Sequence, residues 1–318
     1  MRRRQFLGIV GVTAAWLLSP PADAQQKMAR IGILLTDDAE TMGPVREGLK
    51  ELGHVEGHNI QFVILSAEGK PDRLPQLAAQ LVQSGVDVII ASLTPAAIAA
   101  KNATRDIPIV MAPAGNPVAT GLIASLARPG GNVTGVSGTG PELAAKSLEL
   151  IREVIPSASR VAVLTSAQDP VGKLYIEQVE MGARSMRIEV QPVLVKKADD
   201  LGSAFADISR AHAAAVIAQV SLPIRDMADL ALQYRLPAVS TQKSMVRVGG
   251  FASYSASFVE RGHEVAAYVD KILKGEKPAD LPVQQPSRFE LTINLKTAKA
   301  LGLTISPVLL NRADEVIE

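Results

Sequence analysis

The chain has 318 residues, of which 47% are hydrophobic and 20% charged, and this composition excludes an intrinsically disordered protein and suffices for two domains of ordinary size. Its 33 basic and 32 acidic side chains give a net charge of +1, which predicts no nucleic-acid partner. It contains no cysteine, which excludes disulfides, thiolate catalysis and a cysteine-linked lipid anchor.

Residues 1–24 are predicted to be a cleaved export signal. The basic run Arg2-Arg3-Arg4 precedes the apolar run Phe6–Leu18, which is too short to span a bilayer comfortably, and Ala22-Asp23-Ala24 offers the small residues that a signal peptidase requires. The stretch Arg3-Arg4-Gln5-Phe6-Leu7 also looks like a twin-arginine export signal, with an ordinary secretion signal as the open alternative. We therefore expect the mature protein to work in a periplasm without a lipid anchor.

From Arg30 onward, short apolar runs alternate with segments of helical periodicity, a pattern typical of parallel sheets covered by helices on both faces. In the first half, the pattern predicts strands at 30–35, 59–66, 86–91, 108–112 and 133–136. The helices predicted between them are 45–52, 72–83, 96–104 and 118–126. Thr94-Pro95 predicts a helix start, because Thr can cap free amide groups and Pro suits the first helical position.

The second half continues in the same rhythm. Its predicted strands are 160–165, 189–195, 214–219, 237–240 and 250–254. Its predicted helices are 142–154, 173–187, 201–211 and 224–234. One more amphipathic helix, a closing strand and a final helix are predicted at 259–273, 289–294 and 295–301.

The two halves also repeat one another in sequence. Arg30-Ile-Gly-Ile-Leu34 is matched by Arg160-Val-Ala-Val-Leu164, and Val88-Ile-Ile-Ala-Ser-Leu-Thr-Pro95 by Val216-Ile-Ala-Gln-Val-Ser-Leu-Pro223. A repeat this long predicts two similar lobes with a cleft between them rather than a solenoid. The predicted fold is therefore α/β, with two similar doubly wound parallel-sheet lobes joined by three crossovers. The breaks in the rhythm place lobe 1 at 25–138 plus 257–280 and lobe 2 at 139–256 plus 281–318.

Four phrases spread over the mature chain are distinctive. They read Gly48-Leu-Lys-Glu-Leu-Gly53, Ser125-Leu-Ala-Arg-Pro-Gly-Gly-Asn-Val-Thr-Gly135, Tyr268-Val-Asp-Lys-Ile-Leu-Lys-Gly275 and Phe289-Glu-Leu-Thr-Ile-Asn-Leu-Lys-Thr-Ala-Lys-Ala-Leu-Gly-Leu303. Together they resemble the tryptophan-transporter-type family of ABC substrate-binding proteins. The resemblance implies a type I periplasmic binding fold, and delivery of a small-molecule ligand to a membrane permease with its cytoplasmic ATPase. It also implies that some relatives bind aromatic amino acids.

One residue departs from that family's pattern. After the fourth strand the family usually has Asp-Pro-Val, whereas this chain has Asn116-Pro117-Val118. If the acidic residue holds a ligand ammonium group, the neutral amide weakens the case for an amino-acid ligand. We otherwise expect a monomer that binds a small carboxylate-bearing ligand, uses no cofactor or metal, and is not an enzyme.

The ligand is expected beyond the carboxyl ends of the strands of both lobes, because the loops there are free to vary and helix N-termini point at the site. The candidates are mostly short hydroxyl and amide side chains, which suit a small polar ligand. They are Thr36, Asp37, Ser92, Thr94, Pro95 and Asn116 from the first half, and Thr165, Ser166, Gln168, Gln219, Ser221, Gln242 and Tyr254 from the second.

Each candidate also has a simpler interpretation. Thr94 and Ser221 could grip a ligand carboxylate at two helix starts, or they could serve only as a helix cap and a turn residue. Asp37 could form an ion pair with a cationic group of the ligand, although the acidic neighbours in its loop suggest a solvated turn. Tyr254 could stack on the ligand or pack at the hinge, with Phe258 and Tyr175 as weaker alternatives.

The sequence gives little sign of catalysis or of metal binding. His54-Val-Glu-Gly-His58 has helical zinc spacing, but its glycines predict a turn. Neither a Gly-x-Ser-x-Gly elbow nor a phosphate-binding loop occurs. A ligand-sensing subunit of a membrane signalling receptor stays open as an alternative function, and a periplasmic hydrolase is the weaker alternative.

Overall fold

The computed structural model describes residues 28–37, 42–219 and 221–318, so the predicted export signal lies outside the described residues. The first sheet has five strands, all parallel, in the order β2-β1-β3-β4-β5. These strands are β1 (Ala29–Leu35), β2 (Ile60–Ser66), β3 (Val88–Ala91), β4 (Ile109–Gly115) and β5 (Val133–Gly138). Each lies close to its predicted range.

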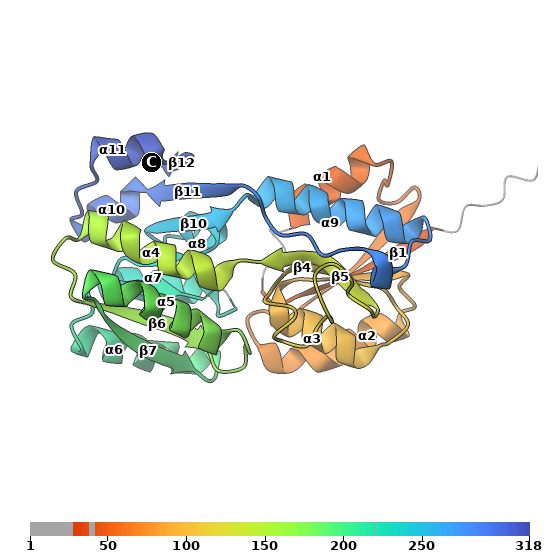
Figure 1. Cartoon of the computed structure of the whole chain (residues 1–318), viewed down its shortest axis with the longest axis horizontal. Helices are drawn as coiled ribbons and strands as arrows, with labels where there is room; N and C mark the ends of the chain where they lie inside the picture. Colours follow the sequence, from red (N-terminus) through yellow and green to blue (C-terminus); the bar gives the residue numbers. More distant parts are fainter. Residues whose placement is uncertain (1–27, 38–41, 220) are drawn as a thin grey trace, which may run out of the picture.

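Helices cover both faces of this sheet (Figure 1). One face carries α1 (Gly43–Glu51) and α9 (Phe258–Leu273), and the other carries α2 (Leu74–Gln83) and α3 (Leu93–Ala103). The helices α1 and α9 pack closely, since a Cβ added at Gly48 would lie 2.9 Å from the Cβ of Ala266. This contact fixes α9, which comes late in the sequence, onto the first lobe.

The second sheet repeats the plan of the first. Its five equivalent strands run in the order β7-β6-β8-β9-β10, which matches β2-β1-β3-β4-β5, and two more strands extend its edge. The strands are β6 (Arg160–Ser166), β7 (Glu189–Val195), β8 (Val216–Ala218), β9 (Ala238–Ser240), β10 (Ala252–Ala256), β11 (Phe289–Asn294) and β12 (Glu315–Ile317). Among these, β11 pairs antiparallel with β10, so the second sheet is mixed. The prediction of two similar lobes from the internal repeat is confirmed.

The second sheet is also covered on both faces. One apolar cluster contains residues from α4 (Gly140–Val154), α5 (Gly172–Met186), α10 (Leu295–Leu301) and α11 (Pro307–Arg312). The other contains residues from α6 (Leu201–Arg210), α7 (Ile224–Gln233) and α8 (Lys243–Arg247). Each lobe therefore has its own pair of cores, which is the condition for the lobes to move as units.

Three chain crossings join the lobes (Figure 1). The chain leaves the first lobe between β5 and α4, returns to it between β10 and α9, and leaves again before β11. Leu281 and Val283 still pack in the cores of the first lobe, and Gln284 forms a parallel bridge with Val136. The last crossing therefore lies beyond residue 284, a few residues later than the predicted boundary at 280.

Two predicted helical features are wrong. Residues 118–126 form turns rather than a helix, because Gly121 adopts a positive φ of 71° and Ile123 donates to the carbonyl of Pro117. Helix α3 begins at Leu93 with Ser92 at the N-cap position, so Thr94-Pro95 lies inside the first turn. The sequence reasoning also missed α8, α11 and β12, which are too short to show periodicity.

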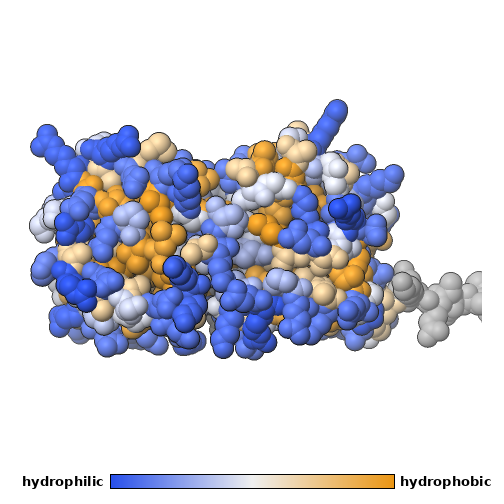
Figure 2. All heavy atoms as spheres, turned by 90° about the horizontal axis from the view of Figure 1, so that it is seen from below, coloured by the Kyte–Doolittle hydropathy of each residue, from blue (hydrophilic) through white to orange (hydrophobic). Residues whose placement is uncertain are grey.

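The surface matches this layered plan. Seen from below, hydrophobic residues gather over the middle of each lobe and hydrophilic residues cover most of the rim (Figure 2). None of the helices in the described part of the chain has the length and apolar character needed to cross a bilayer.

Candidate ligand-binding site

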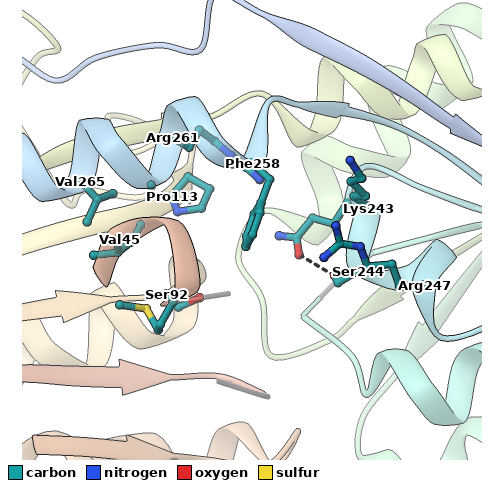
Figure 3. A pocket seen from close by; sticks show the side chains of 13 residues that line it. Val45, Ser92, Pro113, Lys243, Ser244, Arg247, Phe258, Arg261 and Val265 are labelled. Carbon is teal, nitrogen blue, oxygen red and sulfur yellow. Dashed lines mark hydrogen bonds between the residues drawn. The ribbon is translucent and has the colours of Figure 1, made fainter. Parts of the chain in front are cut away.

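Two adjoining cavities lie where the lobes face one another. We call the first the polar chamber; it is lined among others by Thr94, Gly115, Thr139, Asp169, Tyr175 and Ser221. We call the second the basic chamber; it is lined among others by Met42, Val45, Ser92, Lys243, Arg247 and Phe258 (Figure 3). Pro113, Gln242 and Arg261 line both chambers, so the two form one continuous site.

Buried hydroxyl groups without partners mark the polar chamber. The side-chain oxygens of Thr139, Tyr175 and Ser221 form no hydrogen bond of good geometry within the described part of the chain, although Thr241 lies near the Tyr175 hydroxyl and Asp169 near the Ser221 hydroxyl. Burial raises the pKa of the Tyr175 phenol, so this group is a neutral donor at physiological pH. An unpaired buried polar group costs about 1–3 kcal/mol. Three such groups around one cavity indicate a site built to hydrogen-bond a polar ligand.

Asp169 supplies the acidic group of this chamber. It follows β6 and is 7% exposed. Its Oδ1 accepts the backbone N–H of Val171 at 2.9 Å, and its Oδ2 accepts Nε2 of Gln219 at 2.8 Å. Gln219 is itself fixed, because its Oε1 accepts the N–H of Ser166 at 3.0 Å. Burial raises the pKa of Asp169, and the hydrogen bond from the Val171 N–H together with the neighbouring Ser221 hydroxyl opposes that rise.

Arg261 supplies the cationic group. It lies in the first turn of α9, at the second crossing, and keeps some accessible surface while lining both chambers. Burial lowers its pKa to about 10, partly offset by the negative charges of Glu264 and Glu290. No ion pair holds its guanidinium within the described residues, and its Nε has no hydrogen-bond partner there. This cation is therefore available to a ligand anion.

Backbone geometry brings the first lobe close to the chamber. Leu93, at the start of α3, has a φ of 68°, which is strained for a bulky side chain. The hydroxyl of Thr94 accepts the N–H of Gly115 at 2.9 Å, which ties the ends of β3 and β4 together. A Cβ at Gly115 would lie 3.2 Å from Val171 of the other lobe. A larger residue at 115 would therefore resist this approach of the lobes.

The lobes also touch along the side away from the crossovers, which we call the mouth. Nε2 of Gln168 donates to Oδ1 of Asp72 at 2.8 Å, and the N–H of Ile224 donates to Oδ2 of Asp37 at 3.4 Å. A Cβ at Gly69 would lie 2.8 Å from the ring of Pro223. These residues follow β1, β2, β6 and β8, whereas the crossovers leave from β5 and β10. The structure is thus a closed arrangement of the two lobes.

The structure brings together five of the thirteen predicted site residues. The residues that line a chamber are Ser92, Thr94, Gln219, Ser221 and Gln242. The others line neither chamber, namely Thr36, Asp37, Pro95, Asn116, Thr165, Ser166, Gln168 and Tyr254.

Several of these outer residues have other tasks. Asp37 and Gln168 form the mouth contacts, and Thr36 donates to the carbonyl of Ser92 at 2.9 Å. The side-chain oxygen of Asn116 accepts the N–H of Ala119 at 3.1 Å, which stabilises a turn. The polar groups of these residues stabilise the loops or join the two lobes, and they thereby support the residues that line the chambers.

Tyr254, which was expected to stack on the ligand, lines neither chamber. Its ring stacks instead on Phe289, with 6.1 Å between the centroids and 23° between the planes. Both rings line a surface groove on the second lobe, together with Lys146 and Arg312. Residues on β10 alternate between the two faces of the sheet, and Tyr254 points to the face covered by α4.

Sequence reasoning missed the two charged residues of the polar chamber, Asp169 and Arg261. Arg261 had a recognisable signal, because it precedes Val265 by four residues and Tyr268 by seven and so continues the apolar stripe of α9. A charged residue on a buried stripe is unusual and points to a function. Asp169 stands next to the predicted Gln168, but no pattern distinguishes an inward-facing loop residue from an outward-facing one.

Comparisons with known proteins agree with this geometry. The family model for ABC transporter substrate binding proteins matches residues 35–317. A protein of Clostridioides difficile (strain R20291) described as a tyrosine-binding protein is 27% identical over 286 residues, which cover 87% of this chain and 82% of that protein.

Two solved structures are also similar. A conserved domain protein from Vibrio cholerae O1 biovar El Tor is 30% identical, with a TM-score of 0.83 over 91% of this chain and 100% of that one. An ABC domain from Streptococcus pneumonia in complex with L-Trp is 28% identical, with a TM-score of 0.82 over 91% of this chain and 99% of that one.

Proposed function

Because the chain belongs to the family of ABC transporter substrate-binding proteins, we propose that it closes its two lobes around one small α-amino acid and presents it to a membrane permease with a cytoplasmic ATPase. The observation that carries this proposal is that the polar chamber is lined by one carboxylate and one guanidinium group, which could each bind an opposite charge of the ligand. Asp169 and Arg261 both line it, and no ion pair joins them within the described residues.

The polar chamber would take the charged head of the ligand. Arg261 can bind the carboxylate with two N–H groups, and Asp169 can accept the ammonium group. The unpaired hydroxyls of Thr139, Tyr175 and Ser221 would complete the hydrogen bonds of the head group. The names of two relatives support this ligand class, since one is described as tyrosine-binding and the other is a complex with L-Trp.

Asn116 does not count against an amino-acid ligand in this arrangement. Its side chain stabilises a turn and lines neither chamber. The acid expected for an ammonium group is supplied by Asp169 of the second lobe. Because head-group contacts then come from both lobes, the ligand binds the closed form better and shifts the hinge equilibrium toward it.

The test is calorimetric titration with three compounds that share the 4-hydroxyphenyl group and with L-tryptophan. L-tyrosine is compared with tyramine, which lacks the carboxylate, and with 3-(4-hydroxyphenyl)propionate, which lacks the ammonium group; L-tryptophan is the fourth. We expect an amino acid to bind at about −8 kcal/mol, a micromolar Kd, and both truncated compounds to bind at least about tenfold more weakly. Equal binding of a truncated compound, or no binding of either amino acid, contradicts the proposal.

The cellular setting is part of the same proposal. We expect export through the signal in residues 1–24, by the twin-arginine route, to a periplasm, where the protein acts as a monomer and without catalysis. Fractionation of cells that express the full chain, with Arg3-Arg4 replaced by Lys-Lys as the matched variant, tests the route. Unchanged export of the variant would favour an ordinary secretion signal.

A further inference from the structure

We propose that the ligand extends from the polar chamber into the basic chamber and carries a second anionic group, which Arg247 recognises. The inference rests on the proposed function, since it assumes that the amino-acid head sits beside Arg261 and Asp169. It narrows the substrate class to amino acids that have an apolar middle and an acidic far end.

The charge of the basic chamber is one-sided. Lys243, Arg247 and Arg261 line it, and no Asp or Glu of the described residues does. Lys243 is neutralised from behind by ion pairs with Glu290 at 3.8 Å and with Glu315. Arg247 forms no such ion pair within the described part of the chain. Arg261 is assigned to the ligand head group, so Arg247 is the further cation of this chamber that no ion pair balances within the described residues.

The position of Arg247 suits recognition from a distance. It ends the short helix α8, and its side chain is directed toward Phe258 (Figure 3). Gln242 lines the same chamber. Gln242 also lines the polar chamber, and its side-chain oxygen accepts the hydroxyl of Ser244 at 3.4 Å. A ligand that passes Gln242 from the head-group end therefore meets Arg247 next.

Part of the wall of the basic chamber is apolar. Met42 and Val45 of the first lobe and Phe258 and Val265 of α9 line the basic chamber. Such walls bind an aliphatic or aromatic segment, whereas a small zwitterion without side chain would leave them uncovered. An anionic end group is favoured over a neutral one, because the Arg fork binds carboxylate with two charge-assisted hydrogen bonds.

The experiment compares L-phenylalanine with 4-carboxy-L-phenylalanine, which share head group and ring and differ in one distal carboxylate. We expect the wild-type protein to bind 4-carboxy-L-phenylalanine about tenfold tighter, the scale of one charge-assisted contact at a partly exposed site. In Arg247→Gln, this preference for the distal carboxylate should disappear. Arg210→Gln, which removes an exposed arginine on α6, should keep the preference.

The possible failures are distinct. If the wild-type protein binds both compounds equally, or prefers L-phenylalanine, the inference is wrong and the proposed function stands. If the preference survives in Arg247→Gln, Arg247 is not the recognition residue and the inference is also wrong. If neither compound nor L-tyrosine binds, the proposed function is wrong, and the inference that depends on it is wrong as well. Raising the salt concentration should reduce the preference in the wild-type protein, because Arg247 is exposed enough to be screened.

Discussion

Replacing Arg261 by methionine should change ligand affinity and protein stability in different directions. The methionine keeps most of the volume and removes the cation that lines both chambers. Truncating one partner of a buried charge pair costs about 2–5 kcal/mol of binding energy, so the affinity for an amino-acid ligand should fall by about thirtyfold or more.

The same substitution should not lower the stability of the ligand-free protein. Burial lowers the pKa of Arg261 to about 10, so burial disfavours the charged form of this side chain. Removing the charge relieves that cost, but it also removes the partner of Glu264 and Glu290. We therefore expect the melting temperature of ligand-free Arg261→Met to be equal to that of the wild type or a few degrees higher.

The assay is calorimetric titration with L-tyrosine and L-tryptophan, combined with thermal unfolding of both proteins with and without ligand. Arg210→Met on the exposed face of α6 serves as the control for loss of one surface arginine. Retained affinity in Arg261→Met would refute the assignment of the ligand carboxylate to this residue. A melting temperature lowered by more than about 5 °C would instead show that the arginine is structural.

Three further predictions follow from the same geometry. Gln168→Ala and Asp72→Ala should each weaken ligand binding by about threefold, because each removes the same hydrogen bond across the mouth. The double variant should bind no more weakly than either single variant. Additive losses of affinity in calorimetry would exclude a shared contact. Burial raises the pKa of Asp169, so its carboxylate should become protonated at a higher pH than an ordinary carboxyl group. Amino-acid binding should therefore weaken as the pH falls. Asp169→Asn should bind the amino acid weakly, and its affinity should depend less on pH. In the ligand-free protein the same raised pKa makes the ionised form the less stable one, so this group favours stability below its pKa and disfavours it above. Tyr254→Ala should leave the ligand affinity unchanged and lower the melting temperature, because its ring packs on Phe289 away from both chambers; a weaker affinity would place Tyr254 back in the site.

The fold was predictable because it depends on repeated, strong patterns. The runs at Arg30 and Arg160 begin equivalent central strands, and the sheet order around them is the same in both lobes. The failures concern short or irregular segments. Residues 118–126 have helical composition, but Gly121 and the turn held by Asn116 stop the helix. Helix α8 has five residues, too few for any periodicity, although it carries Arg247.

The site was predictable only to the level of loops. The rule that ligands bind beyond the carboxyl ends of strands identified Thr94, Gln219 and Ser221 correctly as residues that line the polar chamber. It could not tell which side chains of a loop face the cavity and which reach across the mouth, as Gln168 does. It also passed over Arg261, because α9 was read as an ordinary amphipathic helix that covers a sheet.

The balance of energies explains why this closed arrangement needs a ligand. Closing the polar chamber leaves the hydroxyls of Thr139, Tyr175 and Ser221 without partners, which costs about 3 kcal/mol or more, and it also buries part of the surface of Arg261. The exposed hydrogen bond between Gln168 and Asp72 across the mouth stabilises the closed form by only about 1 kcal/mol. We therefore expect the ligand-free protein to populate the open form. A ligand that satisfies these groups reverses the balance, so the same unpaired atoms that destabilise the empty closed form provide the energy that closes the occupied one.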